Sequence, residues 1–292
     1  MAIVPWSSEE FPPIGRCIYA REGEQHSAPF TDEHIIPFGL LPKGGDWFLP
    51  ASSCLNCNDI TKKFEDMCLS QTMGVFRAKL DLKTRRKKKR AEPREVVFKR
   101  PDGTVDIKQM KNEELPHYCI GFDWPTAGLL RDQPPDSRDF NGKVLVRYPK
   151  GALENFVPEQ HGIRLGRIRE LDFARMLAKI AHSYAFAKCG IDTFQPMLLD
   201  LILGRAENAS YLVGGDHSGQ IPDQPAIMHD IYPVGCRVEP SGAEYLLVAI
   251  RLFAMLGMPR YHVVVGKKLK QLSLPKAPNS PGIRVDRNNF QD

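Results

Sequence analysis

The sequence predicts an α+β fold in two parts. The chain has 292 residues, 42% of them hydrophobic and 26% charged, so it can bury a sizeable core and divide into two domains. Residues 14–70 are rich in loop formers and carry all the metal-ligand spacing, whereas short strands, a long helix and apolar runs follow from residue 94. We therefore expect a small domain at 1–70, a helix and basic linker at 71–93, and a mixed α+β domain of unassigned role at 94–292.

The composition excludes several classes of protein. No segment has the long uncharged apolar run of a membrane helix, and the start MAIVPWSSEEFPP lacks the basic lead and apolar core of a signal peptide. Of the seven cysteines, only Cys54 and Cys57 are close enough in sequence to act together, which argues against a disulfide framework. We therefore expect a cytoplasmic protein without a membrane partner, holding reduced thiols or one metal site.

The N-terminal part is predicted to pair a histidine strand with a short helix. His34 precedes Ile-Ile-Pro37, which places it in a strand or at a strand end. Residues 59–68 are expected to form a short helix, and residues 69–82 a second helix that continues into a basic block.

The C-terminal part is predicted to alternate between strands and helices. A Pro-Asp-Gly turn between residues 95–99 and 103–108 indicates a hairpin. Apolar residues recur at three- and four-residue steps over 167–188, which predicts a long helix ended by Gly190. The other expected elements are a strand at 143–148, a helix at 195–203 that contains Pro196, and strands of one sheet within 226–238, 244–253 and 261–265.

A dense basic run dominates the charge of the chain. Its seven cations are Lys83, Arg85, Arg86, Lys87, Lys88, Lys89 and Arg90, and without them the net charge of +5 becomes −2. Such a run is either a solvated arm or a binding segment for a polyanion such as a phosphate backbone. If all seven cations displaced condensed counterions, the slope of log K against log salt would be about −6.

A second feature is the Cys54-Leu-Asn-Cys57 turn, which has the spacing of a zinc knuckle. A structural zinc ion needs four ligands, so two must come from elsewhere. Cys17 is one candidate, but position 20, where a second C-x-x-C would have its partner, is alanine. His26 or Cys68 could supply the fourth ligand, and buried core cysteines without metal are an equal alternative.

The residues around His34 have the chemistry of a hydrolytic site. Glu33 can ligate a hard cation through oxygen, and the imidazole of His34 can take a proton from water near neutral pH. Asn58 offers an amide that could orient the histidine, and the following helix returns Glu65 or Asp66 as a second metal ligand.

These pieces together resemble the HNH endonuclease family, whose fold is a ββα-metal unit. The resemblance rests on Cys17-Ile-Tyr, Asp32-Glu-His-Ile-Ile-Pro37 and Ser53-Cys-Leu-Asn-Cys-Asn58, and it covers about a fifth of the chain. It implies that His34 is the general base, Glu33 a ligand of Mg²⁺ or Mn²⁺, and Asn58 the central polar residue of the motif. The helix lacks the His or Asn of the family's third position, so Glu65 would take that role.

Two functions from different classes follow from these residues. The first is a metal-dependent endonuclease that hydrolyses phosphodiester bonds in DNA, in defence or in the biology of mobile elements. The second is a non-catalytic module that binds nucleic acid or protein and retains only the HNH-like fold. For the nuclease, residues 94–292 are expected to restrain or target the activity, and the same residues could bind a regulatory partner or form a homo-oligomer.

Overall fold

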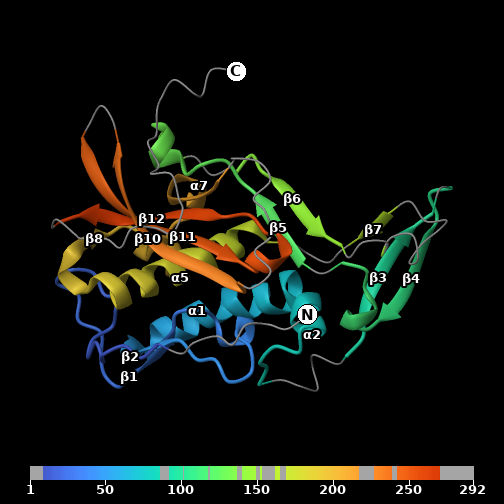
Figure 1. Ribbon diagram of the computed structural model, residues 1–292, viewed down its shortest axis with the longest axis horizontal. Coiled ribbons are helices and arrows are strands. Elements are labelled where there is room, and N and C mark those ends of the chain that lie inside the picture. Colours follow the sequence, from blue (N-terminus) through green and yellow to red (C-terminus); the bar gives the residue numbers. More distant parts are fainter. Residues whose placement is uncertain are drawn as a thin grey trace.

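The computed structural model of this chain describes residues 9–85, 92–100, 102–117, 119–136, 140–148, 152, 162–164, 169–216, 227–238 and 242–269. Its small antiparallel sheets and few helices confirm the mixed α+β class predicted from the sequence. Figure 1 shows a long central helix with a sheet on one side and the N-terminal elements on the other.

The N-terminal elements form a strand–strand–helix unit. Strand β1 (Phe30–His34) pairs antiparallel with β2 (Phe48–Cys54), and His34 lies opposite Phe48. Helix α1 (Leu55–Met67) follows β2 with no intervening loop, because the Cys54 sulfur accepts the Cys57 N–H and caps the first turn. The helix therefore begins earlier than the predicted residue 59.

The helix expected over residues 69–82 is wrong in extent. The chain instead makes a π-helical turn, Cys68–Thr72, followed by the short helix α2, Gly74–Lys79. Met73 separates the two, and glycine at the start of α2 offers little helix propensity to bridge the break. Asp81 then takes a left-handed conformation with φ of 47°, which turns the chain away.

Two small sheets follow, and the hairpin prediction is confirmed. Strands β3 (Arg94–Lys99) and β4 (Val105–Met110) pair antiparallel, and β7 (Gly162–Arg164) joins the other edge of β3. Strand β5 (Cys119–Asp123) pairs with β6 (Lys143–Arg147), which agrees with the strand expected at 143–148.

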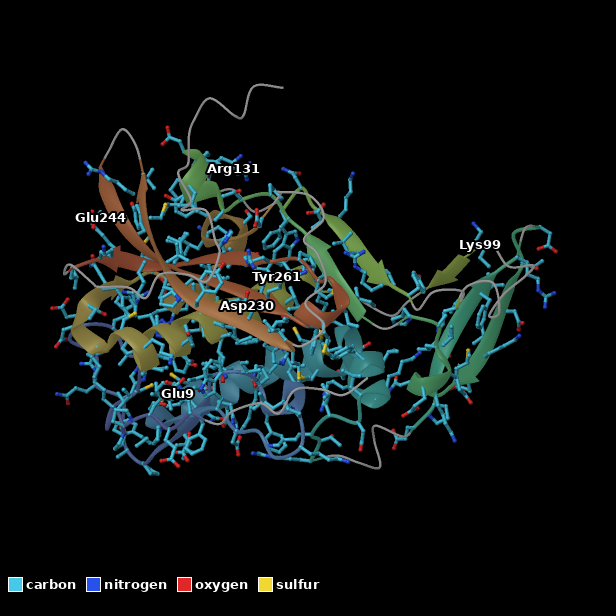
Figure 2. All side chains as sticks on the ribbon, viewed as in Figure 1. Glu9, Lys99, Arg131, Asp230, Glu244 and Tyr261 are labelled. Carbon is cyan, nitrogen blue, oxygen red and sulfur yellow. The ribbon has the colours of Figure 1, made fainter. Side chains whose placement is uncertain are left out.

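The C-terminal sheet contains the three predicted strands side by side. Its order is β10–β11–β12–β8, and β9 also pairs with β12. The bounds are β8 Phe194–Pro196, β9 Val213–Gly215, β10 His229–Val238, β11 Ala243–Leu252 and β12 Tyr261–Lys268. Tyr261, labelled in Figure 2, exchanges hydrogen bonds of 3.0 and 2.9 Å with the backbone of Phe122 and so ties this sheet to β5.

The helix expected at residues 195–203 is also wrong in extent. Gln195 and Pro196 belong to the edge strand β8, where they pair with β12, and helix α6 covers only Leu199–Ile202. Proline is tolerated at such an edge, so sheet pairing prevailed over its use as a first helical residue. The remaining helical turns are α7 Ala209–Leu212 and the 3₁₀ turns Phe38–Leu40, Asn112–Glu114, Gly128–Arg131, Ile191–Thr193 and Ala254–Leu256.

Helix α5 (Glu170–Cys189) is the centre of the molecule, and its prediction is confirmed. Fourteen of its 20 residues are buried, because it packs on α1 on one side and on β11 and β12 on the other. A helix buried on nearly every face normally carries few charges, so the fully buried Lys179 needs a specific partner. Among the described residues, no helix is both long enough and apolar enough to cross a membrane.

Candidate metal centre and histidine site

Four potential metal ligands come together at the N-terminal unit. The ligand atoms of Cys17, His26, Cys54 and Cys57 all lie within 4.8 Å of one another, and this cluster could bind a metal ion such as zinc. His26 Nδ1 lies 3.5 Å from the sulfurs of both Cys54 and Cys57. Three thiols and one imidazole are a common donor set for structural zinc.

Local structure explains how each ligand reaches the cluster. Cys54 ends β2 and Cys57 lies in the first turn of α1, so the C-x-x-C spacing directs both sulfurs to one side. The segment that carries Cys17 runs beside β2, where Ile18 N donates to Ser52 O at 2.8 Å. The Nε2 of His26 lies 3.6 Å from a Glu24 oxygen, an arrangement that resembles the carboxylates behind metal-bound histidines.

Two sulfur–nitrogen distances in the cluster match those of a tetrahedral zinc site. Zinc holds sulfur at about 2.3 Å and nitrogen at about 2.0–2.1 Å, so tetrahedral coordination puts the two ligand atoms roughly 3.5 Å apart. The two observed sulfur–nitrogen distances are 3.5 Å. A hydrogen bond from Cys57 lowers the pKa of Cys17 to about 5, and the same bond raises the pKa of Cys57. A bound cation would favour ionisation of both sulfurs.

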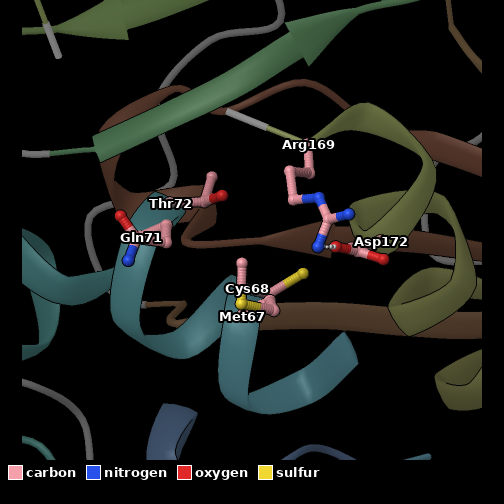
Figure 3. Close-up of a pocket in the computed structure, with 6 residues that line it drawn as sticks. All are labelled: Met67, Cys68, Gln71, Thr72, Arg169 and Asp172. Carbon is pink, nitrogen blue, oxygen red and sulfur yellow. Dashed lines mark ion pairs between the residues drawn. The ribbon is translucent and has the colours of Figure 1, made fainter. Parts of the chain in front are cut away.

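The structure decides between the two candidates for the fourth ligand. His26 completes the cluster, so the alanine at position 20 does not leave it one ligand short. Cys68 lies elsewhere, in a small pocket between the end of α1 and the start of α5, which Figure 3 shows. That pocket also holds the Arg169–Asp172 ion pair, with a nitrogen–oxygen distance of 3.2 Å, and burial raises the pKa of Cys68.

A second cluster brings together the two acids predicted as ligands of a divalent ion. Glu33 of β1 and Glu65 of α1 both face the ammonium group of Lys179 in α5, at 2.6 and 2.9 Å. Lys179 also donates to the backbone carbonyl of His34. The side chains are 0% exposed for Lys179, 5% for Glu33 and 16% for Glu65, so this charged triad lies inside the protein.

The charges of this triad depend on one another. Burial disfavours the ammonium of Lys179, but Glu33 and then Glu65 outweigh it, so the pKa of Lys179 is raised. Burial raises the pKa of Glu65, and Lys179 opposes that effect. Tyr19 lies beside the triad, where burial and then the charge of Glu33 raise its pKa well above the usual value. Removing Lys179 would therefore leave two buried carboxylates without their cation, whereas removing either glutamate would leave Lys179 paired with the other.

His34 lies at the end of β1 with its ring partly exposed. Its Nδ1 is 3.7 Å from an oxygen of Asp46, and its ring packs near Phe38 and Phe48 at centroid distances of 5.6 and 6.3 Å. Burial, followed by the charge of Lys179, lowers the pKa of His34, although Asp46 and Glu33 act in the opposite direction. The imidazole is therefore neutral at pH 7, as a proton acceptor must be.

The basic run begins beside this histidine. Lys83 Nζ lies 3.8 Å from Asp46 and 4.8 Å from the centre of the Phe38 ring, and the Arg85 guanidinium lies 5.0 Å from the same ring. The other predicted nucleic-acid-binding residues, Arg86, Lys87, Lys88, Lys89 and Arg90, lie outside the described residues. The two described cations thus surround the aromatic ring against which His34 packs.

The structure gives the Asn58 amide a partner other than His34. Its amide donates to Thr31 Oγ1 at 3.0 Å, and Thr31 in turn donates to Ser53 O at 3.1 Å. Asn58 therefore ties α1 to the β1–β2 pair. Asp46 is the side chain that faces His34 Nδ1, because the turn between the strands brings it back to the end of β1.

Lys179 and Asp46 had no part in the sequence prediction. Asp46 follows the Gly-Gly pair at positions 44–45 and nothing in its spacing marks it, whereas Lys179 is a lone cation among apolar neighbours in the long helix. A charged residue at the centre of a helix expected to be buried was the signal available for Lys179.

No known protein guides the assignment further, since no family model, curated protein or solved structure matches this chain.

Proposed function

We propose that this protein is an HNH-type endonuclease that hydrolyses phosphodiester bonds in DNA, with His34 as the general base. The observation that supports the proposal most directly is the position of His34 at the end of β1. An oxygen of Asp46 lies 3.7 Å from His34 Nδ1, and Lys83 Nζ lies 3.8 Å from the same oxygen. A neutral imidazole can act as a general base on water, and adjacent cations can stabilise the negative charge that develops on a phosphate.

The proposed reaction uses these groups in a fixed order. His34 removes a proton from water, and the resulting imidazolium is stabilised by Asp46. The water oxygen bonds to phosphorus while the bond from phosphorus to the leaving ester oxygen breaks, and that oxygen takes a proton from solvent. Arg85 and the remaining cations of the basic run hold the phosphate backbone.

We further propose that zinc fills the cluster of Cys17, His26, Cys54 and Cys57. Four protein ligands leave no open position for water, so the ion would be structural. It would fix the loop of Cys17 and His26 to the β2–α1 junction, and thereby fix β1 and His34.

A divalent ion at Glu33 and Glu65 does not fit this arrangement. Mg²⁺ or Mn²⁺ in such a site stabilises charge on the scissile phosphate. Here the Lys179 ammonium lies 2.6 and 2.9 Å from the two carboxylates, inside the space such an ion would need. The proposed reaction therefore places no metal ion between these two carboxylates.

The same triad favours a second function. Because Glu33 and Glu65 are buried against Lys179, the N-terminal unit could serve as a nucleic-acid-binding module without catalysis. If the protein is a nuclease, residues 94–292 would restrain or target it, and they could also bind a partner or a second copy of the chain.

Replacing His34 separates the two functions. His34→Ala is expected to slow cleavage of a labelled DNA duplex by at least 100-fold, which is the usual contribution of a general base, and to leave its affinity unchanged. The wild-type rate should rise with pH through the lowered pKa of His34 and be constant above neutrality. Equal cleavage by both proteins would exclude His34 as the base, and binding without cleavage by either would favour the second function.

Replacing Arg85 tests the polyanion surface. Arg85→Ala is expected to weaken duplex binding for all sequences alike and to reduce the slope of log K against log salt by about 1, because one phosphate contact is lost. The measurement is a fluorescence-anisotropy titration at several salt concentrations. Arg237→Ala, in the C-terminal strand β10, is the control, and an equal change there would show a nonspecific charge effect.

A further inference from the structure

The Lys179 ammonium lies among oxygen atoms of the kind that bind small metal cations in proteins. Its Nζ lies 2.6 Å from Glu33 Oε1 and 2.9 Å from Glu65 Oε1, and it donates a hydrogen bond to the backbone carbonyl of His34. Two carboxylates and a carbonyl are also the oxygen ligands that hard divalent ions prefer. The oxygens come from β1 and α1, whereas the cation comes from α5 in the C-terminal half.

The carboxylate pair has capacity for a further ligand. Glu33 is 4% exposed, and its second oxygen, Oε2, is buried without a hydrogen-bond partner among the described residues. A buried carboxylate oxygen without a partner is costly, so it marks a place where a cation of higher charge could bind. Lysine supplies a single positive charge on a long stem and cannot contact every oxygen there.

From these contacts we infer that Lys179 is the resident cation of the Glu33–Glu65 site and keeps divalent ions out of it. The inference concerns metal binding alone, and it holds whether or not His34 cleaves DNA. It has two consequences. The wild-type protein binds no Mg²⁺ or Mn²⁺ at these carboxylates, and removal of the lysine side chain turns the same oxygens into a divalent-ion site.

Mn²⁺ titration of the full-length, zinc-loaded protein, followed by electron paramagnetic resonance, tests this inference. Wild type is expected to bind no Mn²⁺ that depends on Glu33 or Glu65. Lys179→Ala is expected to bind one Mn²⁺ ion per chain, and saturating Mn²⁺ should raise its unfolding temperature by about 5 °C or more. Lys179→Ala combined with Glu65→Gln should lose both effects.

Two results would overturn the inference. One is a Mn²⁺ ion in wild type that Glu33→Gln or Glu65→Gln removes. The other is a Lys179→Ala protein that binds no Mn²⁺, or that remains unfolded when Mn²⁺ is supplied during refolding. A failed nuclease assay would change neither result, because the readouts are bound Mn²⁺ and thermal unfolding.

Discussion

Lys179→Ala, without added divalent ions, is expected to lower the free energy of unfolding by about 3–5 kcal/mol, the usual cost of breaking a buried ion pair. The mutation leaves Glu33 and Glu65 as two neighbouring carboxylates in a buried site without their cation. Urea unfolding at pH 7 measures the loss. The loss should shrink towards pH 5, because burial raises the pKa of Glu65 in the folded protein, which can then take up a proton that the unfolded chain does not yet bind.

A neutral replacement of the whole triad is the matched control. Glu33→Gln, Glu65→Gln and Lys179→Met together remove every charge but keep the approximate volumes, so most of the stability should return. If the free energy of unfolding of Lys179→Ala lies within about 1 kcal/mol of the wild-type value, the triad contributes little to stability and the prediction is wrong.

Loss of one ligand from the cysteine–histidine cluster is the second large effect. Cys57→Ser is expected to remove bound zinc and to unfold the β1–β2–α1 unit, because structural zinc sites supply about 10–16 kcal/mol of apparent binding energy in small peptide domains. The core shared with α5 should keep part of the remaining structure. Zinc content by mass spectrometry and thermal unfolding by circular dichroism measure the two effects.

Cys68→Ala is the control for this substitution. Cys68 is as buried as Cys57, but it lies outside the cluster, in the pocket beside Arg169. It should keep one zinc ion per chain and lose only the modest stability of a small buried side chain. Equal zinc content in Cys57→Ser and wild type would rule out the proposed site.

The elements that could be predicted from sequence are those set by local pattern. The periodicity of the long helix gave α5, the Pro-Asp-Gly turn gave the β3–β4 hairpin, and apolar runs gave β10, β11 and β12. The helix predicted at 195–203 is wrong in extent because Gln195 and Pro196 pair with β12. Tertiary structure sets that contact, and local propensity does not.

In the candidate site, too, local spacing predicts some of the residues, and only tertiary packing brings in the others. Cys54 and Cys57 are separated by only two residues, so it could be predicted that their sulfurs lie close together. His26 was one of two candidates for the fourth ligand. Glu33 and Glu65 do come together, as expected, but the cation between them comes from Lys179, 145 residues away from His34. Spacing carries no information about a contact made across that distance by helix packing.

Nicking of supercoiled plasmid DNA tests the proposed function most directly. Purified wild type and His34→Ala, both zinc-loaded and folded, would be compared with added Mg²⁺, with added Mn²⁺ and in buffer freed of divalent ions. The proposal predicts open-circular product from wild type in at least one of these buffers, and none from His34→Ala in any of them. Equal nicking by the two proteins, or no nicking by either in all three buffers, would contradict it.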